Sequence, residues 1–443
     1  MISFSRRVPV IGFGLLLVAG LFFSTSTLAA TPKKDVMYLV GADESATKAA
    51  AGRLGGTAVG SLTKAFAAAV ADLSAGSNVT IKLAAGEYNG DFGSGAYALG
   101  VINAPTATLK LEGGFKPDFS SRSPFRLPSM IVATPQRSAP LLKFAANSKL
   151  GAFIVDGVSW DSQASNSYDA KTNSLLYGKS CTFPFVQFYY LETNLLVFQN
   201  CVIANSANRA IEPLIRAATP EAEIRFSNCI IFNNRIPLKL DSARFRNKPA
   251  RMVVDHCSFL INWAYNPDPE TSNPASLEIG SKDAAGEIVI TNNLFYSNFG
   301  GAILALGGPP MVVSNNNFVG NGLLHGQSES DAVAMIISAG GRKQPISMGM
   351  IGDMPLVKEG SGNVSIAPGI PLALDQVKTV DSSTVKAEAS WQNEVRRLLG
   401  MNLQGGRVDI KNYAPKKEYD PANPPFPTKN EAEKYGAQLG NAR

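Results

Sequence analysis

The sequence predicts an all-β solenoid, in which short strands from successive coils stack into parallel sheets. The first observation is a short phrase that recurs from Leu195 to Asn321. It consists of an apolar residue, two further positions, a Cys or Asn marker, one position and a second apolar residue, and an Asn usually follows five residues after the marker. The markers are Cys201, Cys229, Cys257, Asn293 and Asn316. Internal repetition of this kind is typical of solenoids.

The second observation is the spacing of the markers, which lie 28, 28, 36 and 23 residues apart. These intervals are too irregular for helical repeats but suit coils whose turns differ in length. The third is alternation, because Cys257 and Phe259 lie two positions apart on a strand and face the same side. We expect the markers to point inward and to stack about 4.8 Å apart. An inward Asn requires that its amide bond the turn backbone and the next Asn in the column.

The phrase, the coil lengths and the Asn column resemble the right-handed parallel β-helix proteins of the pectate-lyase-like superfold, and more narrowly the uncharacterised secreted bacterial members. The resemblance covers about residues 78–321, and Gly113–Pro124 is similar to a segment common in the bacterial group. It implies a single-stranded right-handed parallel β-helix. It is weak for function, because one superfold carries many activities.

The predicted organisation has four parts. Residues 1–30 have the pattern of a secretory signal peptide, since two arginines precede an apolar run that ends in small residues. Residues 31–77 hold a strand and a capping helix, residues 78–345 form the β-helix, and residues 346–443 form a C-terminal capping region and an extended tail. A permanent membrane anchor is the alternative for the first part, but its apolar run is shorter than a usual span. We expect a secreted or periplasmic bacterial protein with no stable membrane span after cleavage.

The ends of a β-helix expose its apolar core and need covering. We expect a strand at Asp35–Val40 and an amphipathic helix over Ser61–Ala75, with Ser61 as its N-cap, at the N-terminal end. A second amphipathic helix is predicted over Ser383–Leu399, followed by a Pro-rich extended segment from Asn412 to Pro427.

Four cysteines in an exported chain would suggest disulfides, because that compartment is oxidising. Cys201, Cys229 and Cys257, however, share one inward column, where the stacking distance exceeds the separation of roughly 3.8 Å that bridged Cβ atoms prefer. We therefore expect a buried thiol stack, with a Cys201–Cys229 or Cys229–Cys257 bridge as the alternative. Cys181 has no evident partner in the sequence.

The composition shows a mild excess of positive charge, with 41 Lys and Arg against 35 Asp and Glu. This excess is compatible with an acidic glycan partner and equally with ordinary solubility. The moderate charge density, the three tryptophans and the absence of a recognition motif argue against a nucleic-acid-binding protein.

One outward column is predicted from the strand that follows each marker. Aligning these strands by their apolar residues places Glu212, Lys239 and Glu278 on neighbouring coils, about 5 Å apart. Such a row could bind sugar hydroxyls or a cation. The alternative is a plain ladder of charges between strands, which contributes little beyond solubility.

Basic and aromatic side chains suggest a glycan-binding groove near this column. Guanidinium groups suit carboxylates and sulfates, although a solvated turn is the alternative interpretation. The candidate arginines are Arg209, Arg216, Arg235, Arg244, Arg246 and Arg251. Trp160, Trp263 and Tyr265 lie in or near two long loops, 162–179 and 264–274, and could stack on sugar rings or pin their own loops.

The resemblance implies two chemistries for a glycan substrate. Lyases and epimerases of the superfold use a basic residue to remove the proton beside a uronate carboxylate, whose charge Ca²⁺ or an Arg neutralises. Its hydrolases use clustered aspartates, for which Asp156 and Asp161 are the near pair in this chain. Asp255 and His256 resemble a pectate-lyase segment, but Val254 replaces that family's Trp, so we interpret them as turn or ladder residues.

The sequence therefore predicts an exported β-helix protein that binds an acidic polysaccharide. If it is catalytic, we expect β-elimination of the lyase or epimerase type, with Lys239 or Arg251 as base or charge neutraliser and Glu212 or Glu278 holding a cation such as Ca²⁺. The alternative is a non-catalytic module that binds glycan or serves in polysaccharide export and assembly. No ligand set for a metal is evident, and we expect a monomer.

Overall fold

The computed structural model describes residues 34–90, 96–167, 179–240, 249–260, 262, 275–280, 285–296, 298, 301–321, 333–339, 342–366 and 435–437. These residues belong to one compact unit, residues 33–443. The predicted signal peptide, the predicted helix Ser383–Leu399 and the predicted extended segment lie outside the described residues. None of the helices in the described ranges has the length and apolar character that a membrane crossing requires.

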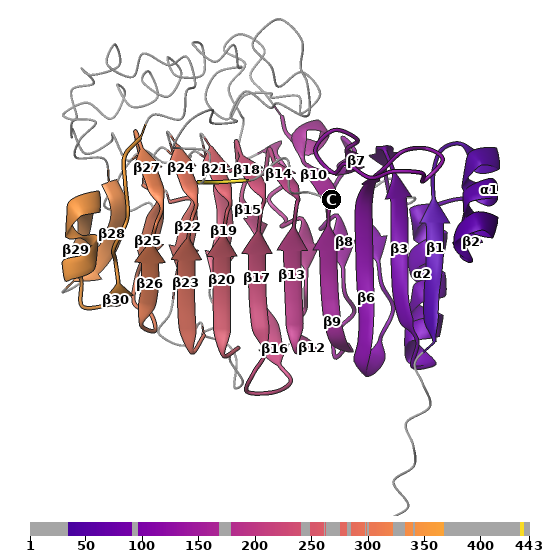
Figure 1. Ribbon diagram of the computed structural model, residues 1–443, viewed down its shortest axis with the longest axis horizontal. Helices are drawn as coiled ribbons and strands as arrows, with labels where there is room; N and C mark the ends of the chain where they lie inside the picture. The colour runs from indigo at the N-terminus through magenta and orange to yellow at the C-terminus, as the bar shows by residue number, and fades with distance from the viewer. Residues whose placement is uncertain are drawn as a thin grey trace, which may run out of the picture. The chain divides into compact units, whose positions relative to one another are not determined.

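Three sheets form the body of the protein, and successive coils contribute strands to them in the order A, B, C (Figure 1). Sheet A consists of β2 (Thr57–Ala58), β1 (Asp35–Val40), β3 (Asn78–Ala84), β6 (Asn103–Phe115), β9 (Lys149–Asp156), β13 (Leu195–Gln199), β17 (Glu223–Ser227), β20 (Arg251–Asp255), β23 (Glu287–Thr291), β26 (Met311–Ser314) and β30 (Val357–Glu359), with β12 (Leu191–Thr193) and β16 (Ile215–Ala217) alongside.

Sheet B consists of β4 (Gly86–Tyr88), β7 (Ser129–Val132), β10 (Val158–Asp161), β14 (Val202–Ala204), β18 (Ile230–Phe232), β21 (Ser258–Leu260), β24 (Leu294–Tyr296) and β27 (Asn317–Val319). Sheet C consists of β5 (Tyr97–Ala98), β8 (Leu142–Lys143), β11 (Val186–Gln187), β15 (Arg209–Ile211), β19 (Ile236–Leu240), β22 (Leu277–Ile279), β25 (Ile303–Ala305), β28 (Val333–Ala339) and β29 (Arg342–Ser347). The neighbours in sheets A and B pair in parallel, which confirms the predicted all-β parallel solenoid.

The apolar positions of the repeated phrase stack in register, as the sequence predicts. The first apolar column is Phe198, Phe226, Val254, Ile290 and Val313, and the second is Ile203, Ile231, Phe259, Phe295 and Phe318. All ten side chains are fully buried. The rings of Phe259 and Phe295 lie stacked with their centroids 4.7 Å apart, close to the spacing of the strands that carry them.

The corner between sheets A and B depends on a left-handed residue that precedes each marker. This residue is Asn200, Asn228, His256, Asn292 or Asn315, with φ between 50° and 56°. Asparagine tolerates this conformation better than most residues, which explains its recurrence here. His256 takes the same place in its coil, and its Nδ1 lies 2.7 Å from Oδ2 of Asp255. The Asp-His pair is therefore a turn element, in agreement with the sequence interpretation.

Buried asparagine ladders join the coils at two corners. At one corner the Oδ1 atom of Asn316 accepts hydrogen bonds from the backbone N–H and the side-chain amide of Asn293, at 3.0 and 2.9 Å. At the next corner Asn234, Asn262, Asn298 and Asn321 repeat the same arrangement. Each amide also donates to a core carbonyl, as Asn298 does to Phe259 at 2.9 Å. The predicted inward Asn column is confirmed.

The N-terminal end of the core is covered by helix α2 (Leu62–Ser74). Its N-cap is Ser61, whose hydroxyl accepts from the backbone N–H of Lys64, and Phe66 and Leu73 are buried in the main core. This predicted cap is confirmed. A second helix, α1 (Glu44–Leu54), lies beside β1 and β2 and was not expected from the sequence, because its buried face consists of Thr47 and alanines and lacks a strong apolar stripe.

At the other end of the described core, the chain departs from the regular coil. Strands β28 and β29 form an antiparallel pair, and the 3₁₀ helix η5 (Met348–Asp353) follows. Ile346 and Ile351 are buried in the main core. Strand β30 then adds a further rung to sheet A, and Asn363 continues the asparagine ladder by accepting from Asn316.

The cysteines are all free and buried, and Cys201, Cys229 and Cys257 have no exposed surface. The predicted thiol stack is confirmed and the alternative bridges are wrong. Burial raises the pKa of the Cys201 and Cys229 thiols well above the ordinary value, and the neighbouring thiol in the stack raises the pKa of Cys201 further. Cys181 is buried as well, and it belongs to the residues between β10 and β11, called here the 162–185 insertion.

Replacing one asparagine of the buried ladder tests how much the ladder stabilises the fold. Asn298→Ala leaves Asn262 N–H, the Phe259 carbonyl and Asn321 without their bonds inside a buried corner, so we expect the free energy of unfolding to fall by about 3 kcal/mol. Unfolding in denaturant measures this free energy, and the control is Asn89→Ala, because the Asn89 side chain is exposed. Equal stability of the two variants would contradict the role of the ladder.

The thiol stack predicts how stability changes at alkaline pH. Because the folded pKa is raised, the unfolded chain loses these protons first, and the stability present below about pH 8.5 is lost as the pH rises above it. In reducing buffer, Cys229→Ala should lower stability at pH 7 and weaken the decline between neutral and alkaline pH. A decline identical to that of the wild type would show that the thiols do not titrate with unfolding.

Candidate functional site

The predicted charged column exists on the outer face of sheet C. Lys239 is the register partner of Glu278, and the pairing of Ile211 with Leu238 places Glu212 next to Lys239. The Lys239 ammonium lies 3.5 Å from a Glu278 carboxylate oxygen, and their side chains are only 13% and 7% exposed. Glu212 accepts from Arg209 Nη1 at 3.2 Å. Each charge of the column thus has an ion-pair partner, Glu278 for Lys239 and Arg209 for Glu212, as the charge-ladder alternative implies.

The predicted basic cluster is not brought to one surface among the described residues. Arg251 lies in β20 of sheet A, where it pairs with Glu287 at 3.2 Å, and it is therefore not beside Lys239 as expected. Arg216 lies in β16 on the sheet A side, with its guanidinium 5.8 Å from the centroid of the Tyr190 ring. Arg244 and Arg246 lie outside the described residues.

Two arginines of the predicted cluster do lie near each other, where strands β15 and β19 of sheet C begin. Arg209 is the register partner of Ile236, the residue that follows Arg235. Arg235 donates to Asn208 Oδ1 at 3.1 Å. This pair is the remaining described part of the expected cationic surface.

The expectation that Trp160 stacks on sugar is wrong. Val158 and Trp160 face inward on β10, whereas Ser159 and Asp161 face outward, because side chains alternate along a strand. Trp160 has no exposed surface and its ring lies 6.5 Å from that of Phe185 in the core. Trp263 and Tyr265 lie outside the described residues.

Asp156 and Asp161 do not form a hydrolytic pair. Asp156 ends β9 and accepts from Arg122, Gln199 and Asn200 at 2.5, 2.9 and 2.8 Å. Burial raises the pKa of Asp156, but these hydrogen bonds and the Arg122 charge outweigh it and hold the pKa below the ordinary value. Asp156 is a structural link between coils, and it does not line the cavity that Asp161 lines.

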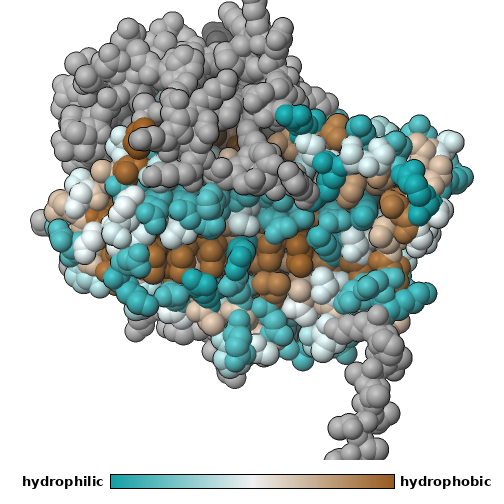
Figure 2. Space-filling model, in the orientation of Figure 1, coloured by the Kyte–Doolittle hydropathy of each residue, from teal (hydrophilic) through white to brown (hydrophobic). Residues whose placement is uncertain are grey.

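The outer face of sheet A is a polar surface with one apolar row, visible as the brown band in Figure 2. The row consists of Ile154, Val197, Val253, Val289 and Val312, interrupted by Arg225. Val197, Val253 and Val289 are buried among their longer neighbours. Charged side chains on one side of this apolar row form ion pairs between strands, as Glu287 does with Arg251 and Lys358. This face has the features of a solvated charge ladder.

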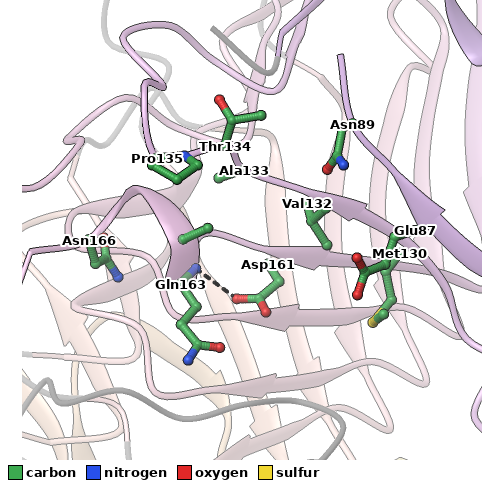
Figure 3. A pocket seen from close by; sticks show the side chains of 11 residues that line it. Glu87, Asn89, Met130, Val132, Ala133, Thr134, Pro135, Asp161, Gln163 and Asn166 are labelled. Carbon is green, nitrogen blue, oxygen red and sulfur yellow. Dashed lines mark hydrogen bonds between the residues drawn. The ribbon is translucent and has the colours of Figure 1, made fainter. Parts of the chain in front are cut away.

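A cavity of about 520 Å³ lies on the outer face of sheet B (Figure 3). Its floor comes from adjacent strands, since Glu87 of β4 is the partner of Met130, and Val132 of β7 is the partner of Asp161. Asn89, Thr134, Gln163 and Asn166 add polar groups around the rim. Among the described lining residues, two are carboxylates and none is Lys, Arg or His.

Asp161 connects this cavity to the framework of the coils. Its Oδ1 accepts from Asn205 Nδ2 at 2.7 Å and from the backbone N–H of Gln163 at 2.9 Å, the bond drawn in Figure 3. Asn205 in turn accepts from Asn233 Nδ2 at 2.6 Å. Asp161 is therefore the end of an asparagine ladder, and its position is fixed before any ligand arrives. Glu87, in contrast, has an exposed side chain.

Arg137 holds the wall of the cavity in place. It is buried, and it donates to the carbonyl oxygens of Ala139, Phe183 and Pro184 at 2.8, 2.8 and 2.9 Å, and to the Ser162 hydroxyl. These contacts join the turn after β7 to both ends of the 162–185 insertion. Burial lowers the pKa of Arg137 to about 10, so the guanidinium stays charged at neutral pH.

The sequence did not indicate most of this site. Glu87 and Arg137 lie in coils that lack the Cys or Asn marker, so nothing in the repeat marked them as neighbours of Asp161. The insertion after Asp161 was the one available signal, since loops on a rigid scaffold often carry function. The structure shows no group of three or more His, Cys, Asp or Glu side chains suited to a metal within the described residues, and the Ca²⁺ site stays a prediction.

Lys239 provides a test of the sheet C column. Lys239→Met removes the ion pair and leaves the Glu278 carboxylate buried, so we expect the free energy of unfolding to fall by about 3 kcal/mol. The double variant Lys239→Met/Glu278→Leu should recover most of that loss in the same denaturant titration. Unchanged stability in Lys239→Met would contradict a structural ion pair.

One comparison with known proteins bears on the fold. Residues 154–342 match the family model described as "Right handed beta helix region". No curated protein and no solved structure matches the chain. The matched residues run from β9 to the start of β29 and include the whole repeated phrase. Together with the parallel sheets, the match shows that the fold is a right-handed parallel β-helix.

Proposed function

We propose that the protein is an extracytoplasmic glycan-binding module whose site is the cavity on sheet B. The cavity itself carries the proposal: its volume of about 520 Å³ lies within the range of small-ligand sites. It combines polar groups that can bond sugar hydroxyls, from Glu87, Asp161 and Asn89, with the apolar side chains of Met130 and Val132. The β-helix fold is compatible with this role but does not assign an activity by itself.

Binding is better supported than bond cleavage. A general base needs access to the proton it removes, whereas Lys239 is paired with Glu278 and largely buried. Asp156 is engaged by Arg122 and lies apart from the cavity. A lyase or epimerase reaction on a uronate, expected from the resemblance, would need a base and a cation together. The described lining of the cavity offers two carboxylates instead.

The lining also bears on the kind of glycan. Glu87 and Asp161 would repel the carboxylates of a uronate chain, so we propose a neutral or amino-sugar polysaccharide as the ligand of this cavity. An acidic polysaccharide is the second candidate, and the observation that favours it is the pair Arg209 and Arg235 on sheet C, which lies outside this cavity. We propose that a single copy of the chain suffices, since sheet B of one chain supplies the cavity floor.

A binding panel distinguishes these candidates. Calorimetry with neutral, amino-sugar and uronate oligosaccharides should show binding to one of the first two classes, and Glu87→Gln should weaken it about tenfold through the loss of a charged hydrogen-bond acceptor. The matched control is Glu44→Gln, an exposed glutamate on α1. Uronate binding that survives Glu87→Gln would favour the second candidate. An equal effect of both variants, or no binding, would contradict the proposal.

A further inference from the structure

A second cavity, of about 440 Å³, adjoins the cavity on sheet B. It is called here the Arg137 cavity, because Arg137 of the turn after β7 lines it together with both ends of the 162–185 insertion. The two cavities share Pro135, Ala164 and Asn166 as lining residues. In Figure 3, Pro135 and Asn166 lie on the side of the first cavity away from Glu87. The Arg137 cavity therefore continues the cavity on sheet B at the end farther from Glu87.

The two neighbouring cavities have opposite charge. The described lining of the Arg137 cavity contains two cations, Arg137 and Lys179, and no Asp or Glu. The described lining of the cavity on sheet B contains two carboxylates and no cation. Hydroxyl side chains add hydrogen-bonding groups to the Arg137 cavity, from Ser138, Ser165, Ser167, Ser180 and Thr182. Cationic nitrogens and hydroxyls together are suited to an oxyanion.

The guanidinium of Arg137 is a buried charge that bonds neutral groups in the described residues. Arg137 is 5% exposed, and it donates to three backbone carbonyl oxygens and to the Ser162 hydroxyl. A guanidinium has five N–H donors, so these four bonds leave a donor for a ligand. Burial lowers the pKa of Arg137, and the Cys181 thiol is the one described group that opposes this effect. Because a buried charge is costly without a counter-ion, a bound anion would stabilise this position.

The Arg137 cavity can be reached from solvent. Ser138, Lys179 and Thr182 are exposed although they line it. Phe183 also lines it and is 45% exposed, which is unusual for a large apolar side chain. An aromatic surface of this kind can pack against a sugar ring. The combination of an aromatic ring and cations favours an anionic group carried by a sugar over a free inorganic ion.

We propose that the Arg137 cavity is an anion site that takes a carboxylate, sulfate or phosphate group. Arg137 supplies a charge and a donor, Lys179 supplies a second charge at the mouth, and the hydroxyls bond the remaining oxygens. The anionic group belongs to a sugar next to the one in the cavity on sheet B, a step that rests on the proposed function. The preferred glycan then carries an amino group beside Glu87 and Asp161 and an anionic group beside Arg137.

Free anions test the site without any sugar. Calorimetry measures the binding of sulfate to the full chain at constant ionic strength, with chloride as the replaced anion, and the anomalous signal of tungstate in crystals locates the ion. We expect saturable sulfate binding and a tungstate peak beside Arg137. Absence of sulfate binding, or a tungstate peak elsewhere alone, would overturn the inference.

Two variants assign the sulfate to the Arg137 cavity. Arg137→Gln should abolish binding, but Arg137 also holds the insertion, so Lys179→Gln is the decisive variant because its side chain is exposed. It should weaken sulfate binding about threefold. The matched control is Lys64→Gln, an exposed lysine on α2, which should bind as the wild type does. Equal affinity of the two lysine variants would contradict the site.

A further variant tests whether the chain supplies its own anion. Asp169 is the one acidic residue in the sequence of the 162–185 insertion, and it lies outside the described residues. Asp169→Asn should bind sulfate about as tightly as the wild type. Sulfate binding that appears only in Asp169→Asn would show that this carboxylate already neutralises the site, and would overturn the inference.

Sulfated and unsulfated forms of one amino-sugar oligosaccharide then test the source of the anion. The wild type and Lys64→Gln should bind the sulfated form about tenfold more tightly, and Lys179→Gln should lose about threefold of this preference. Equal affinity for the two forms, with free sulfate still bound, would overturn the glycan-borne anion and assign the site to a free ion. Failure of every oligosaccharide, with sulfate binding retained, would overturn the proposed function and support the anion site alone.

Discussion

Inward asparagines bond one another from coil to coil through their side-chain amides, and the regularity of the solenoid depends on this contact. Asn262 donates to Asn298 across 36 residues at 2.9 Å, and Asn298 donates to Asn321 across 23 residues at 2.8 Å. The bond is the same although the intervening chain differs greatly in length. A buried amide left without its partner is costly, so the corners stay in register whatever the loops contain. Loops can therefore vary without disturbing the sheets.

The candidate site forms where this framework meets an insertion. Asp161 takes the end of the ladder that runs through Asn233 and Asn205, and the chain then leaves the coil for the 162–185 insertion. Arg137 ties both ends of the insertion to the preceding turn. The cavity is thus built on fixed strands with a fixed wall, which reduces the entropy lost when a ligand binds. Its negative lining follows from Glu87 and Asp161 being two strands apart on one face.

Those features that follow from local alternation could be predicted from the sequence, and those that depend on the path of the coil could not. The repeated phrase placed Lys239 opposite Glu278, since both lie in strands with clear apolar neighbours. The prediction for Trp160 is wrong because its alternation with Val158 on β10, and not the loop that follows, determines the direction of its side chain. Arg251 was assigned to the wrong face, since the residues between β19 and β20 do not reveal where the chain turns from sheet C to sheet A.

The central claim is that a glycan lies on sheet B between Glu87 and Asp161. The most direct measurement is a crystal structure of the protein with a neutral or amino-sugar oligosaccharide. This account predicts sugar density in the cavity over β4, β7 and β10, with ring hydroxyls within hydrogen-bond distance of the two carboxylates. Density beside Lys239 and Glu278 on sheet C, or along the apolar row of sheet A, would contradict it.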